Sequence, residues 1–257
     1  MSCPRLSRSG LRVGGLVVGL ALALGLLAAG PVGAATAVRH DDTVYTFGAA
    51  TFGGSTQGRA PATPPVAIAT ETGSTGYWIV TRAGRGYGVD AANFGSINRT
   101  RPASAPIVGI AGTVTGRGYW LASSDGRVYE FGDAKWAGDL RAQALAAPVV
   151  DIVGRPGGGY WMVSADGGVF AFGGAGYFGS MGGRFLDAPI VAMAATPSGK
   201  GYWLAGADGA VYAFGDAPFR GSLSAVRIGV PIVGIARSRT GGGYWLVGAR
   251  GGVWTFG

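Results

Sequence analysis

The sequence predicts an all-β fold, a β-propeller built from a tandem repeat of about 42 residues. The tripeptide Gly-Tyr-Trp occurs five times, and its tryptophans follow one another at spacings of 42, 41, 42 and 42 residues. Glycine makes up 51 of the 257 residues and alternates with aromatic and β-branched residues, as expected for short strands joined by tight turns. Beyond residue 37, no segment keeps an apolar period of 3.6 residues over three turns, so almost no helix is predicted. The tryptophans of the repeat are Trp78, Trp120, Trp161, Trp203 and Trp245.

Each repeat contains four short elements whose composition is typical of strands. The elements around Trp161 span residues 148–151, 159–163, 169–173 and 177–180. The second element, which carries Gly-Tyr-Trp, is apolar on both faces and is therefore predicted to lie inside a stack of sheets. An Asp-Gly pair precedes the third element and predicts a two-residue hairpin turn. These pairs begin at Asp125, Asp166 and Asp208.

The two ends of the chain predict that the ring of blades is closed. Residues 44–48 and 49–55 resemble a third and a fourth element without a first and a second, and Gly257 ends a third element. We expect residues 51–55 to supply the fourth strand of the last blade, because such an exchange removes exposed sheet edges. This arrangement gives about five four-stranded blades, and six remain an alternative because element 44–48 is left over. The repeat at residues 84–96 is degenerate.

The N-terminal residues 1–37 have the layout of a signal peptide. Basic residues, including Arg5 and Arg12, precede an apolar run over residues 13–29, and small residues follow it. We expect cleavage after Ala34 or Ala37, with the propeller domain spanning residues 38–257; an uncleaved N-terminal anchor is the alternative. Cleavage would remove Cys3, the only cysteine. The protein is accordingly predicted to be secreted or associated with the cell surface, with no membrane span after cleavage.

The charge of the chain excludes one class of partner. The net charge is +8, with 21 basic and 13 acidic residues, and three of the basic ones lie in the predicted leader. The basic residues are spread thinly, whereas specific nucleic-acid binding needs a concentrated basic face. We therefore expect no nucleic-acid partner, although a mildly basic exported protein can adhere to anionic polymers of the cell wall.

The run from residue 159 to residue 173 resembles the repeats of exported bacterial proteins that carry Gly-Tyr-Trp and Asp-Gly-Gly-Val-Phe-Ala-Phe-Gly. The resemblance extends over residues 43–257. It implies a propeller-like fold outside the cytoplasm, and it brings no catalytic residues with it. A weaker similarity to pyrroloquinoline-quinone propeller repeats is set aside because the predicted mature chain lacks cysteine, so no cofactor is expected.

The chain offers few residues for catalysis. The only histidine, His40, follows the predicted cleavage site, so neither a catalytic triad nor a zinc site can be assembled. Most carboxylates recur at turn positions, including Asp133 and Asp216, and are interpreted as structural. Four carboxylates break the repeat, and a glycan-cleaving pair would have to come from such residues, although no two of them can be paired from the sequence. They are Glu71, Glu130, Asp151 and Asp187.

The tryptophans of the repeat are predicted to pack between blades rather than to bind ligand. Trp136 lies off that pattern, at the position of Phe219 in another repeat. Binding is therefore sought where the repeat breaks. The candidate binding residues are Trp136, Arg250, Tyr87 and Asp90.

The sequence favours an exported, non-enzymatic binding or scaffolding propeller. We expect a monomer whose partner is cell-wall polysaccharide or an extracellular protein, with no metal and no catalytic residue assigned. The alternatives are a carboxylate-dependent hydrolase or lyase that acts on glycan over the central channel, and a purely structural repeat domain.

Overall fold

The computed structural model describes residue 44, residues 63–98 and residues 100–257. The predicted signal peptide, His40 and the predicted closing strand at residues 51–55 lie outside this part of the chain. Every regular element within it is a β-strand, so the all-β prediction is confirmed.

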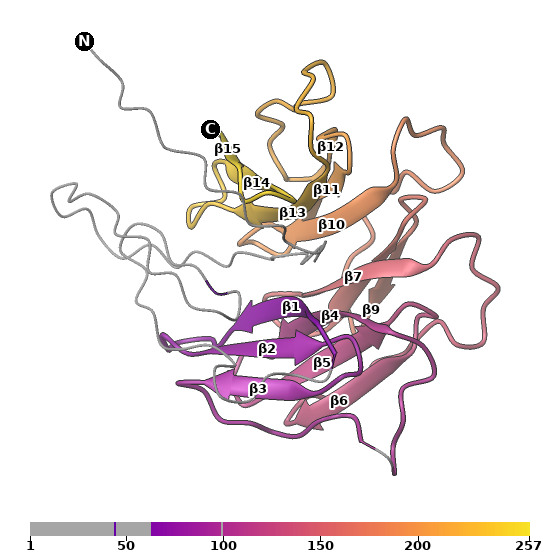
Figure 1. The fold of residues 1–257 in the computed structure, drawn as a ribbon, viewed down its shortest axis with the longest axis vertical. Helices are drawn as coiled ribbons and strands as arrows, with labels where there is room; N and C mark the ends of the chain where they lie inside the picture. The colour runs from indigo at the N-terminus through magenta and orange to yellow at the C-terminus, as the bar shows by residue number, and fades with distance from the viewer. Residues whose placement is uncertain (1–43, 45–62, 99) are drawn as a thin grey trace, which may run out of the picture.

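Fifteen strands form five antiparallel sheets of three strands each, and each sheet is made from consecutive strands (Figure 1). The sheets are β1 (Pro65–Thr70), β2 (Tyr77–Thr81) and β3 (Gly86–Val89); β4 (Ile107–Gly112), β5 (Gly118–Ser123) and β6 (Val128–Gly132); β7 (Val149–Gly154), β8 (Tyr160–Ser164) and β9 (Val169–Phe172); β10 (Ile190–Ala195), β11 (Gly201–Gly206) and β12 (Val211–Gly215); β13 (Ile232–Arg237), β14 (Tyr244–Gly248) and β15 (Val253–Phe256).

The sheets follow one another around an arc, with the first strand of each on the inside (Figure 1). Strands β1, β4, β7, β10 and β13 pack against one another in chain order. The middle strands β5, β8 and β11 are buried along their whole length, as predicted for a strand covered on both faces. The third strand of each sheet is therefore the outermost one.

The repeated tryptophans pack between neighbouring sheets, as predicted. Trp161 and Trp203 are fully buried, and the ring centre of Trp161 lies 5.6 Å from that of Tyr202 in the next sheet. Trp245 is only half-buried, because no sheet follows the fifth one in the described part of the chain. The indoles therefore stabilise the contact between one sheet and the next.

The Asp-Gly pairs form hairpin turns, but the loops have three residues rather than the predicted two. In the turn from β8 to β9, the Ser164 N–H donates to the Gly168 carbonyl around Ala165, Asp166 and Gly167. Only Gly167 adopts a positive φ, of 79°. The Asp166 carboxylate accepts hydrogen bonds from the Ser164 hydroxyl and the Gly168 N–H, so the aspartate stabilises the turn with its side chain rather than with its backbone conformation.

The predicted fourth strand does not form, and the expectation of four-stranded blades is wrong for the residues described. Residues 177–180 belong to no strand. The Tyr202 hydroxyl from the next sheet accepts from the Phe178 N–H at 3.1 Å and donates to the Gly179 carbonyl at 2.7 Å. The tyrosine thus satisfies backbone groups that a fourth strand would have used in its ladder.

The tryptophan of each of the first four repeats anchors the same segment from the other side. Trp161 Nε1 donates to the Gly176 carbonyl at 2.7 Å, and Trp120 Nε1 donates to the Lys135 carbonyl at 2.9 Å. Burial raises the pKa of Tyr119 and Tyr160 to about 12, so the hydroxyls that bind these segments remain protonated donors. The recurring Tyr-Trp pair therefore clamps the segment that links two sheets, the tryptophan from its own repeat and the tyrosine from the next.

The predicted closure is not seen in the described residues, because no strand pairing joins the first sheet to the last there. Val44, the one described residue of the surplus element 44–48, shares a buried cluster with Tyr77 and Ile79 of the first sheet. Val169, the first residue of β9, shares an equivalent cluster with Tyr202 of the following sheet. Val44 therefore lies against the first sheet in the same way as Val169, the valine of a third element, lies against the sheet that follows it.

Candidate binding site

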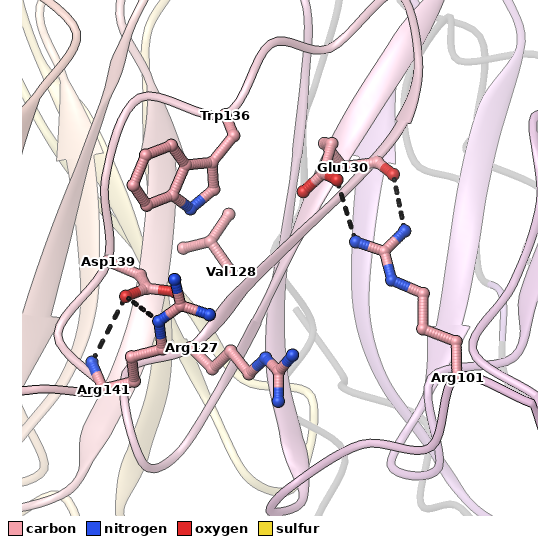
Figure 2. Close-up of a pocket in the computed structure, with 7 residues that line it drawn as sticks. All are labelled: Arg101, Arg127, Val128, Glu130, Trp136, Asp139 and Arg141. Atoms are coloured by element: carbon pink, nitrogen blue, oxygen red, sulfur yellow. Dashed lines mark hydrogen bonds and ion pairs between the residues drawn. The ribbon is translucent and has the colours of Figure 1, made fainter.

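A pocket of about 230 Å³ opens at the outermost strand of the second sheet (Figure 2). Five of its seven lining side chains are charged, and the other two are an indole and a valine. The pocket is lined by Arg101, Arg127, Val128, Glu130, Trp136, Asp139 and Arg141. The hydrolase alternative required a site over the central channel, whereas this pocket lies at the outer strand β6.

Three stretches of chain build the pocket. The first is the segment between β3 and β4, which carries Arg101. The second is the turn before β6 together with β6 itself, and it carries Arg127 and Glu130. The third stretch is the segment after β6, which carries Trp136 and Asp139. That segment is held by the Tyr-Trp clamp, since the Tyr160 hydroxyl of the next sheet donates to the Gly138 carbonyl at 2.5 Å.

Two ion pairs stand on opposite sides of the pocket (Figure 2). Arg101 Nη2 lies 2.8 Å from Glu130 Oε1, and Arg141 Nε lies 3.4 Å from Asp139 Oδ1. The Arg127 side chain extends between the two pairs (Figure 2). Each carboxylate of the pocket therefore already has an arginine partner.

Arg127 is the one arginine of the pocket that takes part in neither ion pair. Its guanidinium carbon lies 5.2 Å from the centre of the Tyr129 ring, and that of Arg101 lies 5.6 Å from the same ring. The Tyr129 ring is fully buried, and its hydroxyl accepts from the Ser104 N–H at 2.8 Å. Within the described residues Arg127 forms no ion pair with a carboxylate. Three guanidinium groups and two carboxylates give the pocket one excess positive charge.

Trp136 provides the apolar surface of the pocket. The residue is 53% exposed, and the guanidinium carbon of Arg141 lies 5.9 Å from its ring centre. The same repeat position holds Tyr177 and Phe219, which are 61% and 60% exposed. Trp136, one of the candidate binding residues, therefore lies exposed at the pocket.

Asp139 is almost completely buried, with 5% of its side chain exposed. Its Oδ1 atom accepts from the Arg141 backbone N–H and pairs with the Arg141 side chain, while Oδ2 has no hydrogen-bond partner among the described residues. A buried carboxylate oxygen without a partner is unfavourable until a donor reaches it. This oxygen has almost no contact with solvent, so it is an unsatisfied acceptor inside the pocket wall.

The other predicted binding residues do not join Trp136. Tyr87 is buried on β3, where the Arg85 guanidinium lies over its ring at 5.4 Å. Asp90 follows β3 and is exposed, with a positive φ of 49°. Arg250 is exposed in the turn from β14 to β15, on the fifth sheet. Of the four candidates, only Trp136 lies at the pocket.

Of the four carboxylates that break the repeat, only Glu130 lines the pocket. Asp151 lies on the inner strand β7, where its oxygens accept from the Ile152 N–H at 2.8 Å and the Met193 N–H of β10 at 3.0 Å. Burial raises the pKa of Asp151 to about 7, and these two backbone hydrogen bonds act in the opposite direction. Asp151 therefore connects two inner strands. The turn residue Asp216 accepts from the Thr196 hydroxyl at 2.8 Å, in agreement with its structural interpretation.

Sequence reasoning missed four charged residues of the pocket: Arg101, Arg127, Asp139 and Arg141. Two of them carried a usable signal. Asp139 stands where three other repeats have serine, at Ser96, Ser180 and Ser222. Arg127 stands where three of the four other repeats have a small residue, at Gly168, Ala210 and Gly252, and the fourth has Arg85. A search for charged residues at positions that are small in most repeats would have found both.

The described part of the chain contains no cluster of three or more histidine, cysteine, aspartate or glutamate side chains that could hold a metal ion. It also contains no helix long and apolar enough to span a membrane.

Comparisons with known proteins bear on the fold. No family model matches the chain, and no curated protein matches it. Among solved structures, it is similar to a protein of unknown function from Bacteroides thetaiotaomicron, with a TM-score of 0.51 and 12% identity over 76% of this chain and 60% of that one. It is also similar to the β-propeller domain of Cps50 (Swd1) from Myceliophteria thermophila, with a TM-score of 0.50 and 13% identity over 73% of this chain and 63% of that one.

A third similar structure is YCF48 bound to D1 peptide, with a TM-score of 0.50 and 15% identity over 77% of this chain and 65% of that one. The chain spans less than two thirds of each of these structures. At such low identity the likeness concerns the fold alone, and it supports a β-propeller architecture for this chain.

Proposed function

We propose that the chain is an exported, non-enzymatic binding propeller whose pocket at Trp136 holds part of a cell-wall polysaccharide. The observation that carries this proposal is the composition of the pocket, in which a half-exposed indole stands among five charged side chains. A sugar ring can stack its C–H face on the indole while its hydroxyl groups exchange hydrogen bonds with the surrounding carboxylates and guanidinium groups.

A protein partner fits the pocket less well. One similar structure, YCF48, is bound to a peptide, so a peptide is a reasonable partner for a propeller of this kind. However, aspartate and glutamate are depleted at the cores of protein–protein interfaces, and two carboxylates line this pocket. We therefore propose the polysaccharide.

Binding is proposed rather than hydrolysis because of the ion pairs. Glu130 and Asp139 line the same pocket, as the two carboxylates of a glycosidase would. Each of them, however, is engaged by an arginine, Glu130 by Arg101 and Asp139 by Arg141. Both carboxylates are thus held in ion pairs, which favours binding over hydrolysis.

The test is co-sedimentation of the purified protein with insoluble bacterial cell wall, from which the attached polysaccharides are left in place or removed. We expect retention by the intact wall and a loss of about tenfold or more in affinity for Trp136→Ala, since one stacked aromatic contributes roughly 1–3 kcal/mol in comparable ring-stacking sites. Tyr177→Ala is the matched control, because Tyr177 has the same repeat position and exposure on the next sheet but does not line the pocket. Equal losses for the two variants, or no retention of the unaltered protein by either wall, would overturn the proposal.

A further inference from the structure

The charges of the pocket indicate which class of sugar it would bind. Building on the proposed function, we propose that the pocket at Trp136 recognises a sugar that carries a carboxylate, such as a hexuronic acid, and that Arg127 binds the carboxylate.

Arg127 is the arginine of the pocket whose guanidinium group is available to bind an anion. The guanidinium groups of Arg101 and Arg141 already face Glu130 and Asp139, whereas Arg127 has no carboxylate partner in the described residues. A guanidinium group matches the planar geometry of a carboxylate and can bind it through two parallel hydrogen bonds. An anion in the pocket would also balance its excess positive charge.

The Tyr129 ring favours one position of the Arg127 guanidinium before any ligand arrives. The guanidinium groups of Arg127 and Arg101 both lie over the ring of the buried Tyr129, at 5.2 Å and 5.6 Å. Arg101 is held further by Glu130 and lies 5.7 Å from the Phe131 ring centre. A cation held in place by packing loses less side-chain freedom on binding, which favours affinity.

The indole of the pocket suits the rest of an acidic sugar. The exposed part of the Trp136 indole offers a face for the sugar ring. An acidic peptide side chain could satisfy Arg127, but it would leave the indole without a matching face. The Arg127 guanidinium and the exposed indole together favour the sugar acid.

The deciding experiment compares two probes by isothermal titration calorimetry. The first is a hexuronic-acid oligosaccharide, and the second is the same oligosaccharide with its carboxylates reduced to primary alcohols. We expect the acidic form to bind about tenfold or more tightly than the reduced form, the effect of one charge-assisted hydrogen-bonded pair. A poly-glutamate of similar charge is the third probe, and we expect it to bind more weakly than the acidic sugar.

The variant Arg127→Ala should abolish the difference between the acidic and the reduced sugar. Arg85→Ala is the matched control, because Arg85 takes the same repeat position and also lies over a tyrosine, Tyr87, but is outside the pocket. It removes the same charge and should keep the difference. Equal losses in the two variants would show that only the general positive charge attracts the probe, and the inference would be wrong.

Two other outcomes separate this inference from the proposed function. Equal binding of the acidic and the reduced sugar would refute the carboxylate site while leaving a sugar-binding propeller intact. Tighter binding of poly-glutamate than of the acidic sugar would refute both, because it would identify an acidic peptide as the ligand.

Discussion

Replacing Asp151 by asparagine should change how the stability of the protein depends on pH. Asp151 lies between the inner strands β7 and β10, and burial raises the pKa of its carboxyl group to about 7 from the usual 3.8. Between pH 4 and pH 7 the folded protein therefore keeps a proton that the unfolded chain has released. Raising the pH through this range favours unfolding, so the contribution of Asp151 is most favourable below pH 4 and is lost by about pH 7.

The size of this effect follows from the two pKa values. Each pH unit between 3.8 and about 7 contributes roughly 1.4 kcal/mol, so the full change is about 4 kcal/mol. The Asp151→Asn variant carries no charge at any pH and removes this dependence. Because the asparagine amide can accept from only one of the Ile152 and Met193 N–H groups through its oxygen, it also carries a pH-independent cost of about 1–3 kcal/mol.

The assay is urea unfolding, followed by tryptophan fluorescence, of both proteins at pH 4, 5, 6, 7 and 8. We expect the variant to be the less stable protein at pH 4 and to gain on the unaltered protein by a few kcal/mol as the pH reaches 8. The other titrating groups are common to both proteins, so they cancel in the difference. A difference in unfolding free energy that stays constant from pH 4 to pH 8 would refute the reasoning.

Two further predictions concern the repeat. Gly201→Ala should lower the free energy of unfolding by about 2 kcal/mol or more in urea titrations, because a Cβ there would lie 2.5 Å from the Phe214 carbonyl oxygen. Gly242→Ala is the control and should have little effect, because its Cβ would meet only a side-chain oxygen, at 3.4 Å. Equal stability of these two variants would contradict the packing argument. Tyr202→Phe and Tyr160→Phe should each cost about 1–3 kcal/mol by the same measurement, since each leaves backbone groups of a linking segment without a partner. Only Tyr160→Phe should also weaken sugar binding, because only its segment borders the pocket; equal weakening by both variants would count against this assignment.

The sequence predicted the elements whose structure depends on their own residues. The apolar runs, the Asp-Gly turns and the alternation along Tyr160–Ser164 specify three strands and their hairpins, and all of these formed. The segment around Phe178 and Gly179 has a strand-like composition, but its conformation is decided by Tyr202, which lies more than twenty residues away in the chain. Local composition carries no information about such a partner.

The candidate site was predictable to a similar extent. Trp136 stood out because it departs from the repeat, and Glu130 stood out for the same reason. Arg101 was missed because its place in the pocket depends on the packing of its segment against Tyr129 and Phe131. Tyr87 was chosen from a degenerate repeat, yet it lies buried on β3, because the segment kept its strand although it lost its motif.

The absence of a fourth strand and the presence of the pocket have a common cause. In a four-stranded blade, the segment after β6 would lie along the outer edge of that strand and fill the space beside it. The Tyr160 hydroxyl instead binds the Ala137 N–H and the Gly138 carbonyl, and this holds the segment against the next sheet. The space between β6 and the segment is then bordered by Glu130 on one side and by Trp136 and Asp139 on the other. The other repeats with this clamp hold the same segment in the same way, but only the second has a charged residue at both positions, since the first has Arg85 in the place of Arg127 and Ser96 in the place of Asp139. The clamp therefore creates the place for a site, and the departures from the repeat give that place its chemistry.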